Sequence, residues 1–535
     1  MFATDRVIEI DIKLPAENWE TIRSQSRNFA SSLGKEPEKR PFTWTKADIT
    51  IDGVLIKNVG IRKKGFFGSI NSERPSLKIK FAEYVDQKPV KGITRLTLNN
   101  NNQDLGRISQ YMTYKLFNDS GTFSPRCSFA KVTVNGEYLG VYSNVESIRK
   151  QFFKRVDGKG DGALFEGTVA DFFPESLPRF EAKNDAADPE ILREITNLLA
   201  EKDLNVDKLS KLIDLDAFIR FWAMESLTGF WDGYCSNQNN FFIYRNPKTA
   251  KLQFVPWGTD SAFAKTTPLP PFRIRPRSVH AKAILPNRLY RIPEFQSLYL
   301  KTLRTMLDEH WQEEKLVAEI DRVEKLLVDH IRKDNKQFGR KIKSYKRFVT
   351  SRRRDIMGEL EEGAPELKSR EKRPVYFSKF GNAKITFSTK WFDRTPGSAN
   401  GLGDVQVELE INGQKVELKD VGAYSELSKW PTPDKQKPPS IVIVGKRASD
   451  GKTLTFGTGL DIDLFKPTRG KSVNIGGVFL DGSGFFDPRK LKMIGGTVTL
   501  TKASMKDGEA VVGTMEIDLM QMKGGTIKTV GEDKP

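Results

Sequence analysis

The spacing of apolar residues changes twice along this chain, and the change constrains the fold more than any other feature. Apolar and polar residues alternate in segments such as "RVIEIDIKL" (residues 6–14), recur at helical spacing over about residues 187–360, and alternate again beyond residue 375. A period of two indicates strands, and a period near 3.6 indicates helices. Because 535 residues exceed what one compact core normally holds, we predict an α+β protein of more than one domain.

The predicted first domain covers residues 1–360 and has two parts. Residues 1–150 show strand patterns, with hairpin signals at Asp52-Gly53 and Asn135-Gly136. Helical spacing is predicted over residues 16–33, and a second helix near residues 105–121 is ended by Gly121. This indicates a mainly antiparallel sheet with a helix inserted between its strands. Residues 187–360 are mostly helical and contain one strand pair, "NNFFIYRN" and "KLQFVPWG".

The rest of the chain is predicted to be a linker and a β domain. Residues 361–374 combine Gly, Pro and charged residues, which is typical of a linker. Almost every periodic segment in residues 375–535 alternates, as in "DVQVELEINGQKVEL". Strands at this spacing predict a β-rich accessory domain, either β-sandwich-like or a barrel.

Composition excludes several kinds of site. Two cysteines give no disulfide framework, and three histidines far apart in sequence make a zinc hydrolase or a His-dependent triad unlikely. The longest apolar runs are too short for a membrane span, and the N-terminal residues lack the apolar segment of a signal peptide. A net charge of +18 favours anionic partners, although basic clusters on helices are usually solvated, so nucleic acid is not the expected partner.

Candidate chemistry is concentrated in "FWDGYCSNQNNFFIY" (residues 230–244) and "FVPWGTD" (residues 254–260). Asp232 is followed at the fifth position by Asn237, and a strand pair then leads to Asp260. This is the order of parts in the catalytic and metal-binding loops of protein kinases, where Asp and Asn supply oxygen ligands. The kinase letters HRD and DFG are absent, and a polar turn that caps a helix would use the same residue types.

The wider sequence resembles a known family. The segments "GIRKKGFFGS", "RPSLKIKF", "LTLNNNNQD", "VNGEYLGVYSNVE" and "WDGYCSNQNNFFIY" occur in the order found in the CotH family of spore-coat-type atypical protein kinases. The resemblance runs from about residue 5 to 360. It implies a divergent two-lobed protein-kinase-like domain that binds ATP and magnesium and phosphorylates Ser or Thr of proteins, often secreted or surface-associated ones.

The resemblance also implies roles for three polar positions. Asp232 corresponds to the acid that orients the acceptor hydroxyl, and Asp260 corresponds to the metal-binding acid. Asn237 fits the amide that binds a second metal by its spacing, while Asn240 lies in the family-like "NNF" and competes for this role.

Nucleotide-binding positions follow from the same comparison. Lys78 is the candidate lysine for the nucleotide phosphates, and Arg74 and Lys80 share its face of the strand by alternation. Gly65 and Gly68 are candidates for a flap over the phosphates, where glycine permits close backbone approach.

Two features concern the boundary between the lobes and the inserted helix. Glu146 is expected at the hinge edge of the nucleotide pocket, although an acid at a helix start is the simpler alternative. Where relatives commonly show Arg-Glu in the inserted helix, this chain has Ser109-Gln110. An ion pair between that helix and the lysine is therefore not expected, and activity could be low or lost.

Two rival functions remain open. A catalytically weak pseudokinase acting as a surface, coat or adhesion scaffold would keep the fold without the chemistry. A polyanion-binding module would use the positive charge, and its affinity would fall steeply with salt. A kinase-like fold can also transfer other parts of a nucleotide.

Overall fold

The computed structural model describes residues 1–25, 27, 32–34, 41–267, 274–393, 402–427, 439–459, 472–482 and 492–524. These residues form two compact units. The first contains Met1–Arg23 and Phe42–Pro374, and the second contains Val375–Gly524 with the described part of Ser24–Pro41. In the described part of the chain, every helix is too short or too polar to cross a membrane.

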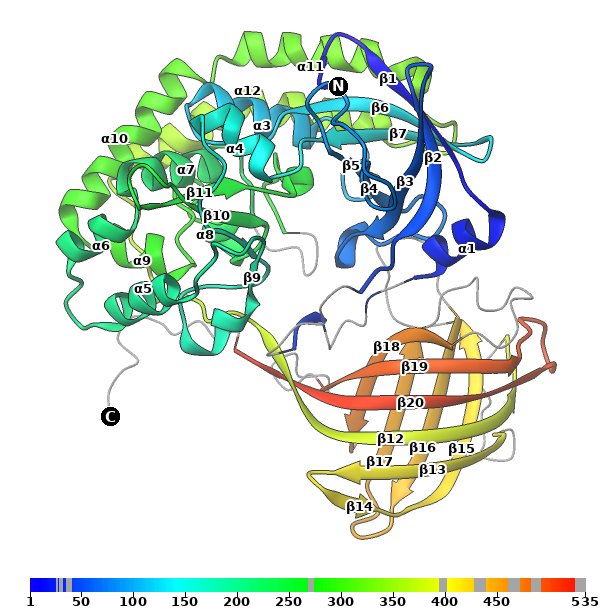
Figure 1. The fold of residues 1–535 in the computed structure, drawn as a ribbon. Coiled ribbons are helices and arrows are strands. Elements are labelled where there is room, and N and C mark those ends of the chain that lie inside the picture. Colours follow the sequence, from blue (N-terminus) through cyan, green and yellow to red (C-terminus); the bar gives the residue numbers. More distant parts are fainter. Residues whose placement is uncertain are drawn as a thin grey trace. The chain divides into compact units, whose positions relative to one another are not determined.

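A closed seven-stranded barrel forms the N-terminal lobe of the first unit, drawn from blue to cyan in Figure 1. Its strand order is β1-β2-β3-β4-β5-β7-β6, and all neighbours are antiparallel except β1 and β6, whose parallel pairing closes the barrel. Alternation predicted the antiparallel strands, but it does not identify a strand's partner, so closure could not be foreseen. The bounds are β1 Val7–Lys13, β2 Thr45–Ile51, β3 Val54–Lys64, β4 Ser76–Lys80, β5 Arg95–Asn99, β6 Cys127–Val134 and β7 Glu137–Val145.

Both predicted hairpin turns are present in the barrel. Asp52 and Gly53 join β2 to β3 with φ values of 47° and 82°, and Asn135 and Gly136 join β6 to β7 with 50° and 87°. Two consecutive residues with positive φ give a turn whose twist matches that of the flanking strands. The residue types at these turns therefore set the register of both strand pairs.

The helix inserted in the barrel, α3 (Ser109–Asp119), connects β5 to β6 and is buried on nearly every side. Its apolar residues join the core of the helical lobe, not that of the barrel. The chain leaves it at Gly121, which has a φ of 74° and donates its N–H to the Asn118 carbonyl at 3.0 Å, as the sequence predicted. The other barrel helix, α1, spans Ala16–Ser24, and the short turn η1 spans Phe67–Ser69.

The helical lobe follows α4 (Lys150–Asp157) and surrounds a four-stranded antiparallel sheet of order β11-β10-β8-β9 (Figure 1). The predicted strand pair is β10 and β11. The bounds are β8 Leu164–Gly167, η2 Pro174–Arg179, β9 Phe180–Ala182, α5 Glu190–Ala200, α6 Val206–Leu212, α7 Leu215–Leu227, α8 Tyr234–Asn237, β10 Phe241–Arg245, β11 Leu252–Pro256, η3 Thr259–Ser261, α9 Ile284–Tyr290, α10 Pro293–Glu309, α11 Glu313–Leu327, η4 Val328–His330 and α12 Phe338–Glu361.

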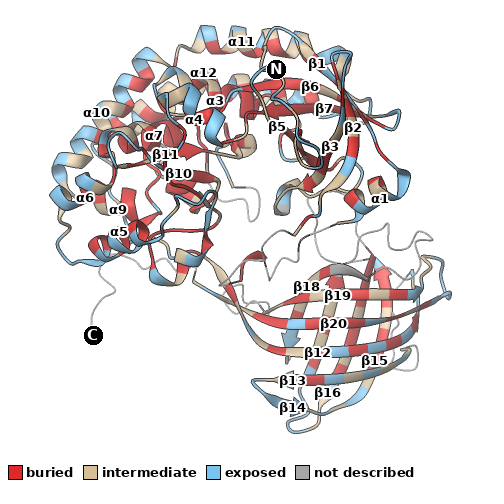
Figure 2. Ribbon diagram, in the orientation of Figure 1, coloured by how far each residue is buried: buried red, intermediate tan, exposed pale blue. Residues whose placement is uncertain are grey.

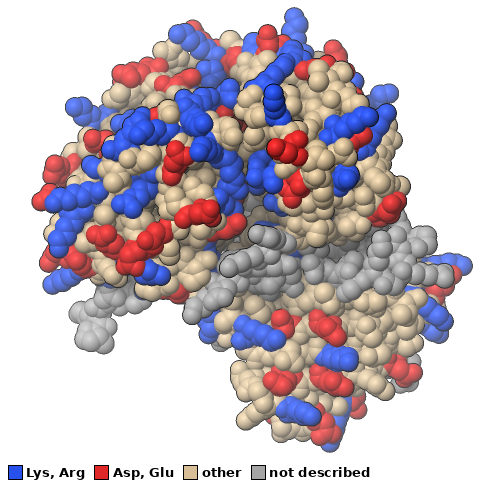
Figure 3. All heavy atoms as spheres, viewed as in Figure 1, with Lys and Arg blue, Asp and Glu red and all other residues tan. Residues whose placement is uncertain are grey.

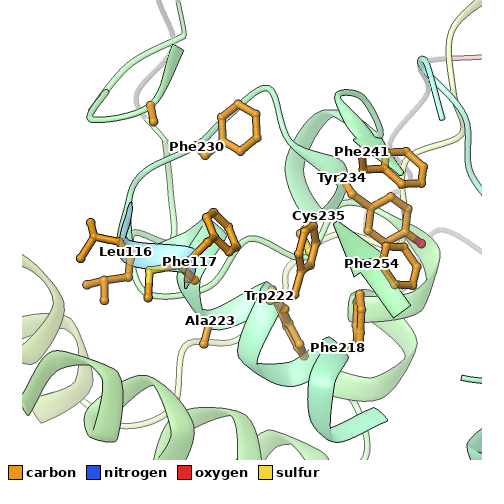
Figure 4. Packing of buried hydrophobic residues seen from close by; sticks show 14 of the residues in the cluster. Leu116, Phe117, Phe218, Trp222, Ala223, Phe230, Tyr234, Cys235, Phe241 and Phe254 are labelled. Atoms are coloured by element: carbon orange, nitrogen blue, oxygen red, sulfur yellow. The ribbon is translucent and has the colours of Figure 1, made fainter. Parts of the chain in front are cut away.

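Aromatic residues of α7, α8, β10 and β11 pack in the core of this lobe (Figure 4). The ring centroid of Tyr234, in α8, lies 4.7 Å from that of Phe241 and 4.8 Å from that of Phe254. Aromatic pairs at such distances stabilise by about 0.5–1.5 kcal/mol each beyond the burial of their area. The four-residue helix α8 is thus anchored by packing rather than by its own backbone bonds.

The second unit is one nine-stranded antiparallel sheet of order β14-β13-β12-β20-β19-β18-β17-β16-β15. Figure 2 shows buried and exposed residues alternating along its strands. The edge strand β15 also contacts β12 and β13, so the sheet curls around a single core. The bounds are β12 Tyr376–Lys390, β13 Asp404–Ile411, β14 Gln414–Val416, β15 Leu418–Leu427, β16 Pro439–Arg447, β17 Thr453–Gly459, β18 Ser472–Asp481, β19 Lys492–Lys502 and β20 Ala510–Lys523.

The single curled sheet differs from a sandwich, in which two sheets face each other, and of the two predicted alternatives it is nearer to the barrel. Alternation correctly indicated strands with one buried face. Strand order and curvature depend on long-range pairing and on the twist that accumulates between strands, and neither leaves a local signal.

His280 makes the helical lobe sensitive to acid. Its side chain is only 3% exposed, and neither ring nitrogen has a hydrogen-bond partner in the described part of the chain. Burial, helped by the nearby positive charges of Arg352 and Lys282, lowers the pKa of His280 to about 3. An unfolded chain binds a proton at this residue below about pH 6.5, so the free energy of unfolding falls as the pH drops from 6.5 towards 3.

We predict that His280→Phe removes part of this pH dependence. Between pH 7.5 and 5 the parent should lose about 2 kcal/mol more unfolding free energy than the variant, because one pKa unit corresponds to about 1.4 kcal/mol. Urea unfolding at the two pH values measures the difference. His310→Gln is the control, because the His310 side chain is only partly buried. Equal losses in the parent and in His280→Phe would contradict the prediction.

Candidate active site

The carboxylate of Asp232 lies in the turn between α7 and α8 and is held by three side-chain amides. Asn237 and Asn239 donate to Oδ1 at 2.7 and 3.2 Å, and Asn240 donates to Oδ2 at 2.8 Å. Burial raises the pKa of Asp232, and the bonds from these amides oppose the increase. The run of amides that follows Asp232 in the sequence therefore folds back as its hydrogen-bond shell.

Glu225 of α7 fixes the start of α8. Its carboxylate accepts the backbone N–H of Tyr234 at 2.9 Å and that of Cys235 at 2.8 Å. Burial raises the pKa of Glu225 to about 8, although these bonds oppose the increase. The first N–H groups of a helix have no partner within it, and this carboxyl group supplies one. The sequence gave no signal for this role, because Glu225 lies inside another helix.

Asp171 ties the same loop to the rest of the lobe. It accepts bonds of 2.8 Å from the Tyr234 hydroxyl, the Gln238 amide and the Ile284 backbone N–H. Burial raises its pKa to about 6. The loop that carries Asp232 is thus clamped at both ends by buried carboxyl groups.

The second acid of the sequence prediction, Asp260, lies in η3, just beyond the β10–β11 ribbon. Gly258 turns the chain there with a φ of 54°. The Ser109 hydroxyl at the start of α3 donates to the Thr259 carbonyl at 2.8 Å. The helix inserted in the barrel therefore touches the turn that carries Asp260.

Asp260 and Asp232 share one electrostatic environment. Burial, together with the negative charges of Asp104 and Asp232, raises the pKa of Asp260 to about 7, while the positive charge of Lys64 acts in the opposite direction. The charges of Asp104 and Asp232 thus reach Asp260, where Lys64 is the basic group that opposes them. A site crowded with like charges favours a bound cation, and perturbed pKa values are typical of functional sites.

The two candidate amides differ in what their oxygens face. Asn240 Oδ1 lies so close to Gly258 that a Cβ atom added to this glycine would be 2.7 Å from it. The backbone carbonyl of Asn240 accepts the Trp257 N–H at 3.0 Å. The Asn237 oxygen accepts a bond of 3.1 Å from Lys372 Nζ. Asn240 therefore presents its oxygen on the side of the Asp260 turn, and Asn237 does not.

Lys64, at the end of β3, is the basic group next to Asp260, and the sequence prediction did not include it. Its Nζ donates to Asn99 Oδ1 and lies 5.5 Å from the ring centroid of Trp257. Burial lowers the pKa of Lys64 to about 8, and the negative charges of Asp260 and Glu166 oppose this. In the sequence, Lys64 belongs to the basic run Arg62–Lys64, which shows only local positive charge, because the direction of each side chain depends on the register of the barrel.

The other predicted cations have different surroundings. Lys78 is half-buried, and loss of hydration lowers its pKa well below the usual value, while the charge of Glu166 opposes this. Arg74 donates to the carbonyls of Leu139 at 2.5 Å and Asn100 at 3.2 Å, so its guanidinium braces the barrel.

A pair of amides, Asn99 and Gln110, links β5 to α3, at the helix where the sequence resemblance predicted that an ion pair would be missing. Asn99, at the end of β5, donates to Gln110 Oε1 of α3 at 2.6 Å and also accepts the bond from Lys64. Gln110 in turn donates to Asn101 Oδ1 at 3.2 Å. The strand and the helix are therefore linked by neutral groups, with the lysine attached to them from a neighbouring strand.

The predicted flap, between β3 and β4, is fastened by the Asn run after β5. Asn102 donates to the Gly68 carbonyl at 2.9 Å, and Asn100 donates to the Ser69 carbonyl at 3.0 Å. Gly65 has a φ of 139°, a conformation that other residues rarely adopt. Both predicted glycines lie in this loop.

Glu146 lies directly after β7, where the chain passes from one lobe to the other, and two arginines hold it. Arg126 donates to it at 2.8 Å and Arg155 at 2.6 Å. Burial acts to raise its pKa, but these bonds hold the pKa below the usual value. The carboxylate is thus engaged in bracing the connection.

A shallow pocket lies between the barrel and the helical lobe. Arg149 Nη1, on its wall, is buried and has no hydrogen-bond partner in the described ranges. The Thr97 and Ser147 hydroxyls bond to each other at 2.8 Å. Its lining combines aromatic, apolar and cationic residues, namely Trp44, Lys78, Ile79, Arg95, Leu96, Thr97, Ser147, Ile148, Arg149, Phe242 and Trp257.

The pocket lining and the Asp260 turn contain residue types that can contact a nucleotide and a metal. Aromatic walls suit a flat base, and the buried, unpartnered Arg149 Nη1 suits an anionic ligand. In the described part of the chain, no three acidic, His or Cys side chains are grouped closely enough to form a metal cage. Mg²⁺ is commonly bound by one or two carboxylates together with phosphate oxygens of the substrate, and Asp260 and Asn240 fit such a site.

Comparison with known proteins gives a consistent result. A family model described as "CotH kinase protein" matches residues 61–355, which is more than half of the chain. "Inner spore coat protein H" of Bacillus subtilis is 23% identical over 274 residues, covering 47% of this chain and 74% of that protein. Two proteins of Rhizopus delemar are similar over shorter regions. "Spore coat protein homolog 1" is 26% identical and "Invasin CotH3" is 26% identical, and the matched regions cover 26% and 30% of those proteins.

One solved structure is also similar. "Crystal structure of A Helicobacter pylori proinflammatory kinase CtkA" matches 60% of this chain and 93% of that chain, at 9% identity and a TM-score of 0.23. A score this low carries no argument.

We predict that Glu225→Ala destabilises the loop that carries Asp232. Two backbone N–H groups would lose their acceptor in a dry interior, which should lower the free energy of unfolding by about 2–4 kcal/mol. Chemical denaturation measures this change. Glu194→Ala is the matched control, because Glu194 is an exposed helical residue. Equal stability of the two variants would contradict the scaffold role of Glu225.

Proposed function

The chain belongs to the CotH kinase protein family, and we propose that it transfers the γ-phosphate of ATP to a Ser or Thr hydroxyl of a protein, with magnesium. The observation that carries the proposal is the pair of acids on either side of the β10–β11 ribbon. Asp232 is fixed by three amides, and its charge acts on Asp260. Phosphoryl transfer needs such positioned charges more than it needs covalent help from the protein.

Asp232 is proposed to receive the acceptor hydroxyl. Among the described residues, the side-chain donors to its oxygens are amides, which fix the direction of the carboxylate and oppose the rise of its pKa. In the reaction the hydroxyl oxygen forms a bond to the γ-phosphorus, the bond to the bridging oxygen breaks, and ADP leaves. The proton of the hydroxyl passes to Asp232.

Asp260 and Asn240 are proposed to hold magnesium together with phosphate oxygens. When bound, the metal would neutralise the phosphate charge and orient the γ-phosphate. The chain's own contribution is the raised pKa of Asp260, because a carboxyl group that is difficult to ionise near Asp104 and Asp232 gains from a nearby cation. Asn237 remains the alternative amide by its spacing, although its oxygen faces Lys372.

Two lysines are proposed to bind different parts of the nucleotide. Lys64 lies within electrostatic reach of Asp260 and is assigned to the phosphates. Lys78 and Arg149 line the pocket and are assigned to the remainder of the nucleotide. The flap that contains Gly65 and Gly68 would cover the phosphates.

The substrate and location are proposals by family. Relatives are named spore coat proteins and invasins, which favours a secreted or surface-associated protein substrate. The second candidate function is a pseudokinase that acts as a coat or adhesion scaffold. Gln110 is the observation in its favour, since protein kinases in their active state place a lysine–glutamate ion pair in that region.

A general polyanion-binding function has less support. Figure 3 shows acidic and basic side chains interspersed on the visible face of the molecule. Alternating charges give weaker fields than a uniform basic surface.

We predict that the protein labels a Ser-rich acceptor protein when it is incubated with γ-labelled ATP and magnesium. Asp232→Asn should lower the rate by about 100-fold or more, because the hydroxyl loses its proton acceptor. Asp260→Asn should remove the dependence on magnesium together with most of the label. Magnesium-dependent ATP binding without any label in the parent would instead support the pseudokinase.

We predict that replacement of Lys64 and replacement of Lys78 change different kinetic constants. Lys64→Met should lower kcat by about 100-fold, as expected for a missing contact to a group that gains charge in the transition state. Lys78→Met should mainly raise the KM for ATP. Initial rates against ATP concentration distinguish these effects, with Lys80→Met as control, because Lys80 pairs with Glu83 at 2.6 Å. A normal kcat in Lys64→Met and a lost kcat in Lys78→Met would reverse the assignment.

A further inference from the structure

Residues 367–373, within the predicted linker, are bound to the helical lobe, and we call this segment the strap. The Leu367 side chain packs against the core of that lobe. Arg291 donates to the carbonyls of Leu367 and Ser369, at 3.4 and 2.7 Å, and Asn287 donates to the Ser369 carbonyl at 3.4 Å. The strap is therefore fixed to α9 by both packing and hydrogen bonds.

The end of the strap is fixed to the loop that carries Asp232. Gln238 of that loop donates to the Lys372 carbonyl, and the Lys372 N–H donates to the Lys282 carbonyl at 2.7 Å. The next residue, Arg373, pairs with Glu175 at 2.5 Å and lies 4.8 Å from the ring centroid of Phe173. These contacts fix the backbone on both sides of the Lys372 side chain.

The Lys372 ammonium group is directed towards the candidate catalytic acid. Its Nζ donates to Asn237 Oδ1 at 3.1 Å, and the amide of the same Asn237 donates to Asp232 Oδ1 at 2.7 Å. One side-chain amide therefore separates the ammonium from the carboxylate. The charge of each group also affects the pKa of the other.

The loop that carries Asp232 lacks a positive charge, and the strap supplies one close to it. Residues 228–244 contain no Lys or Arg, so this loop brings no positive charge of its own to the transferred group. During transfer, negative charge is spread over the three outer oxygens of the γ-phosphoryl group. Cations held in place where that charge develops lower the barrier, and more so in a site that excludes water. Lys64 supplies a cation from the barrel side only.

We propose that Lys372 is a phosphate-binding residue of the transfer reaction, supplied by the strap to the acceptor side of the site. This inference rests on the proposed kinase function. When ATP and acceptor are bound, the ammonium binds an outer oxygen of the γ-phosphoryl group while Asp232 takes the hydroxyl proton. The flexible four-carbon stem of lysine allows the few ångströms of movement from Asn237. A residue three positions before the β domain is then part of the active site.

The rival explanation is structural, since Lys372 could serve only to hold Asn237. The two explanations differ in which state of the reaction they affect. A structural role would weaken every bound state alike. A phosphate-binding role would stabilise mainly the transition state of the transfer. An interaction that is stronger in the transition state raises kcat and leaves ground-state affinity unchanged.

The test uses the full chain with Lys372→Met, Lys372→Arg and Lys372→Gln, and with Lys368→Met as control, since Lys368 is an exposed residue of the same strap. Three quantities are measured, namely kcat for the Ser-rich acceptor, the Kd of magnesium–ADP, and the Kd of magnesium–ADP with aluminium fluoride. Aluminium fluoride imitates the transferred group, so its complex reports on the transition state without turnover.

We expect Lys372→Met and Lys372→Gln to lower kcat and to weaken the aluminium fluoride complex by about 100-fold, with the Kd of magnesium–ADP within about three-fold of the parent. Lys372→Arg should recover most of both losses, and Lys368→Met should match the parent. Equal weakening of both nucleotide complexes, or no recovery in Lys372→Arg, would overturn the inference. A parent without transfer activity would remove the kinase proposal, whereas an active parent with an equally active Lys372→Met would remove this inference alone.

Discussion

The cost of burying a carboxylate governs the arrangement of this site. A charged group taken out of water needs hydrogen bonds or an opposite charge, or it becomes neutral. Asp232 obtains donors from three amides of its own loop, and Glu225 obtains them from the backbone of α8. The donors lie in place only when the loop has its folded shape, and the loop is held in that shape by these same bonds. The hydrogen bonding of Asp232 and the folding of the loop therefore depend on each other.

The same principle connects the barrel to this loop. Asn residues at the end of β5 hold the flap through Gly68 and meet α3 through Gln110. Amides donate and accept at once and carry no charge. They can therefore link the parts of a site that already contains several acids without adding to the repulsion. The bond from the Ser109 hydroxyl to the Thr259 carbonyl completes the path from the barrel to the Asp260 turn.

The features that depend on local sequence could be predicted, and those that depend on long-range pairing could not. Hairpins at Asx-Gly pairs, the helix ended by Gly121 and the β10–β11 ribbon follow from short patterns. The closed barrel, the curled single sheet and the direction of Lys64 depend on strand order and register, which alternation leaves open. The strap was predicted to be a linker, because Gly, Pro and charge in the sequence do not show which side chains a nearby surface will bind. Glu225 gave no signal, since its role depends on the packing of α7 against α8.

Replacement of an ion pair by amides need not abolish the chemistry. A buried ion pair loses much of its Coulomb energy to desolvation, and neutral groups of similar shape can replace it at small cost. What the reaction needs is a cation next to the phosphates, not a particular anion behind it. Asn99 accepts the bond from Lys64, and Gln110 fixes Asn99. Because the pKa of Lys64 is about 8, most of the molecules still carry the charge at pH 7. A lysine bound to an amide is also held less tightly than one bound to a carboxylate, so it is freer to transfer its hydrogen bonds to an incoming phosphate.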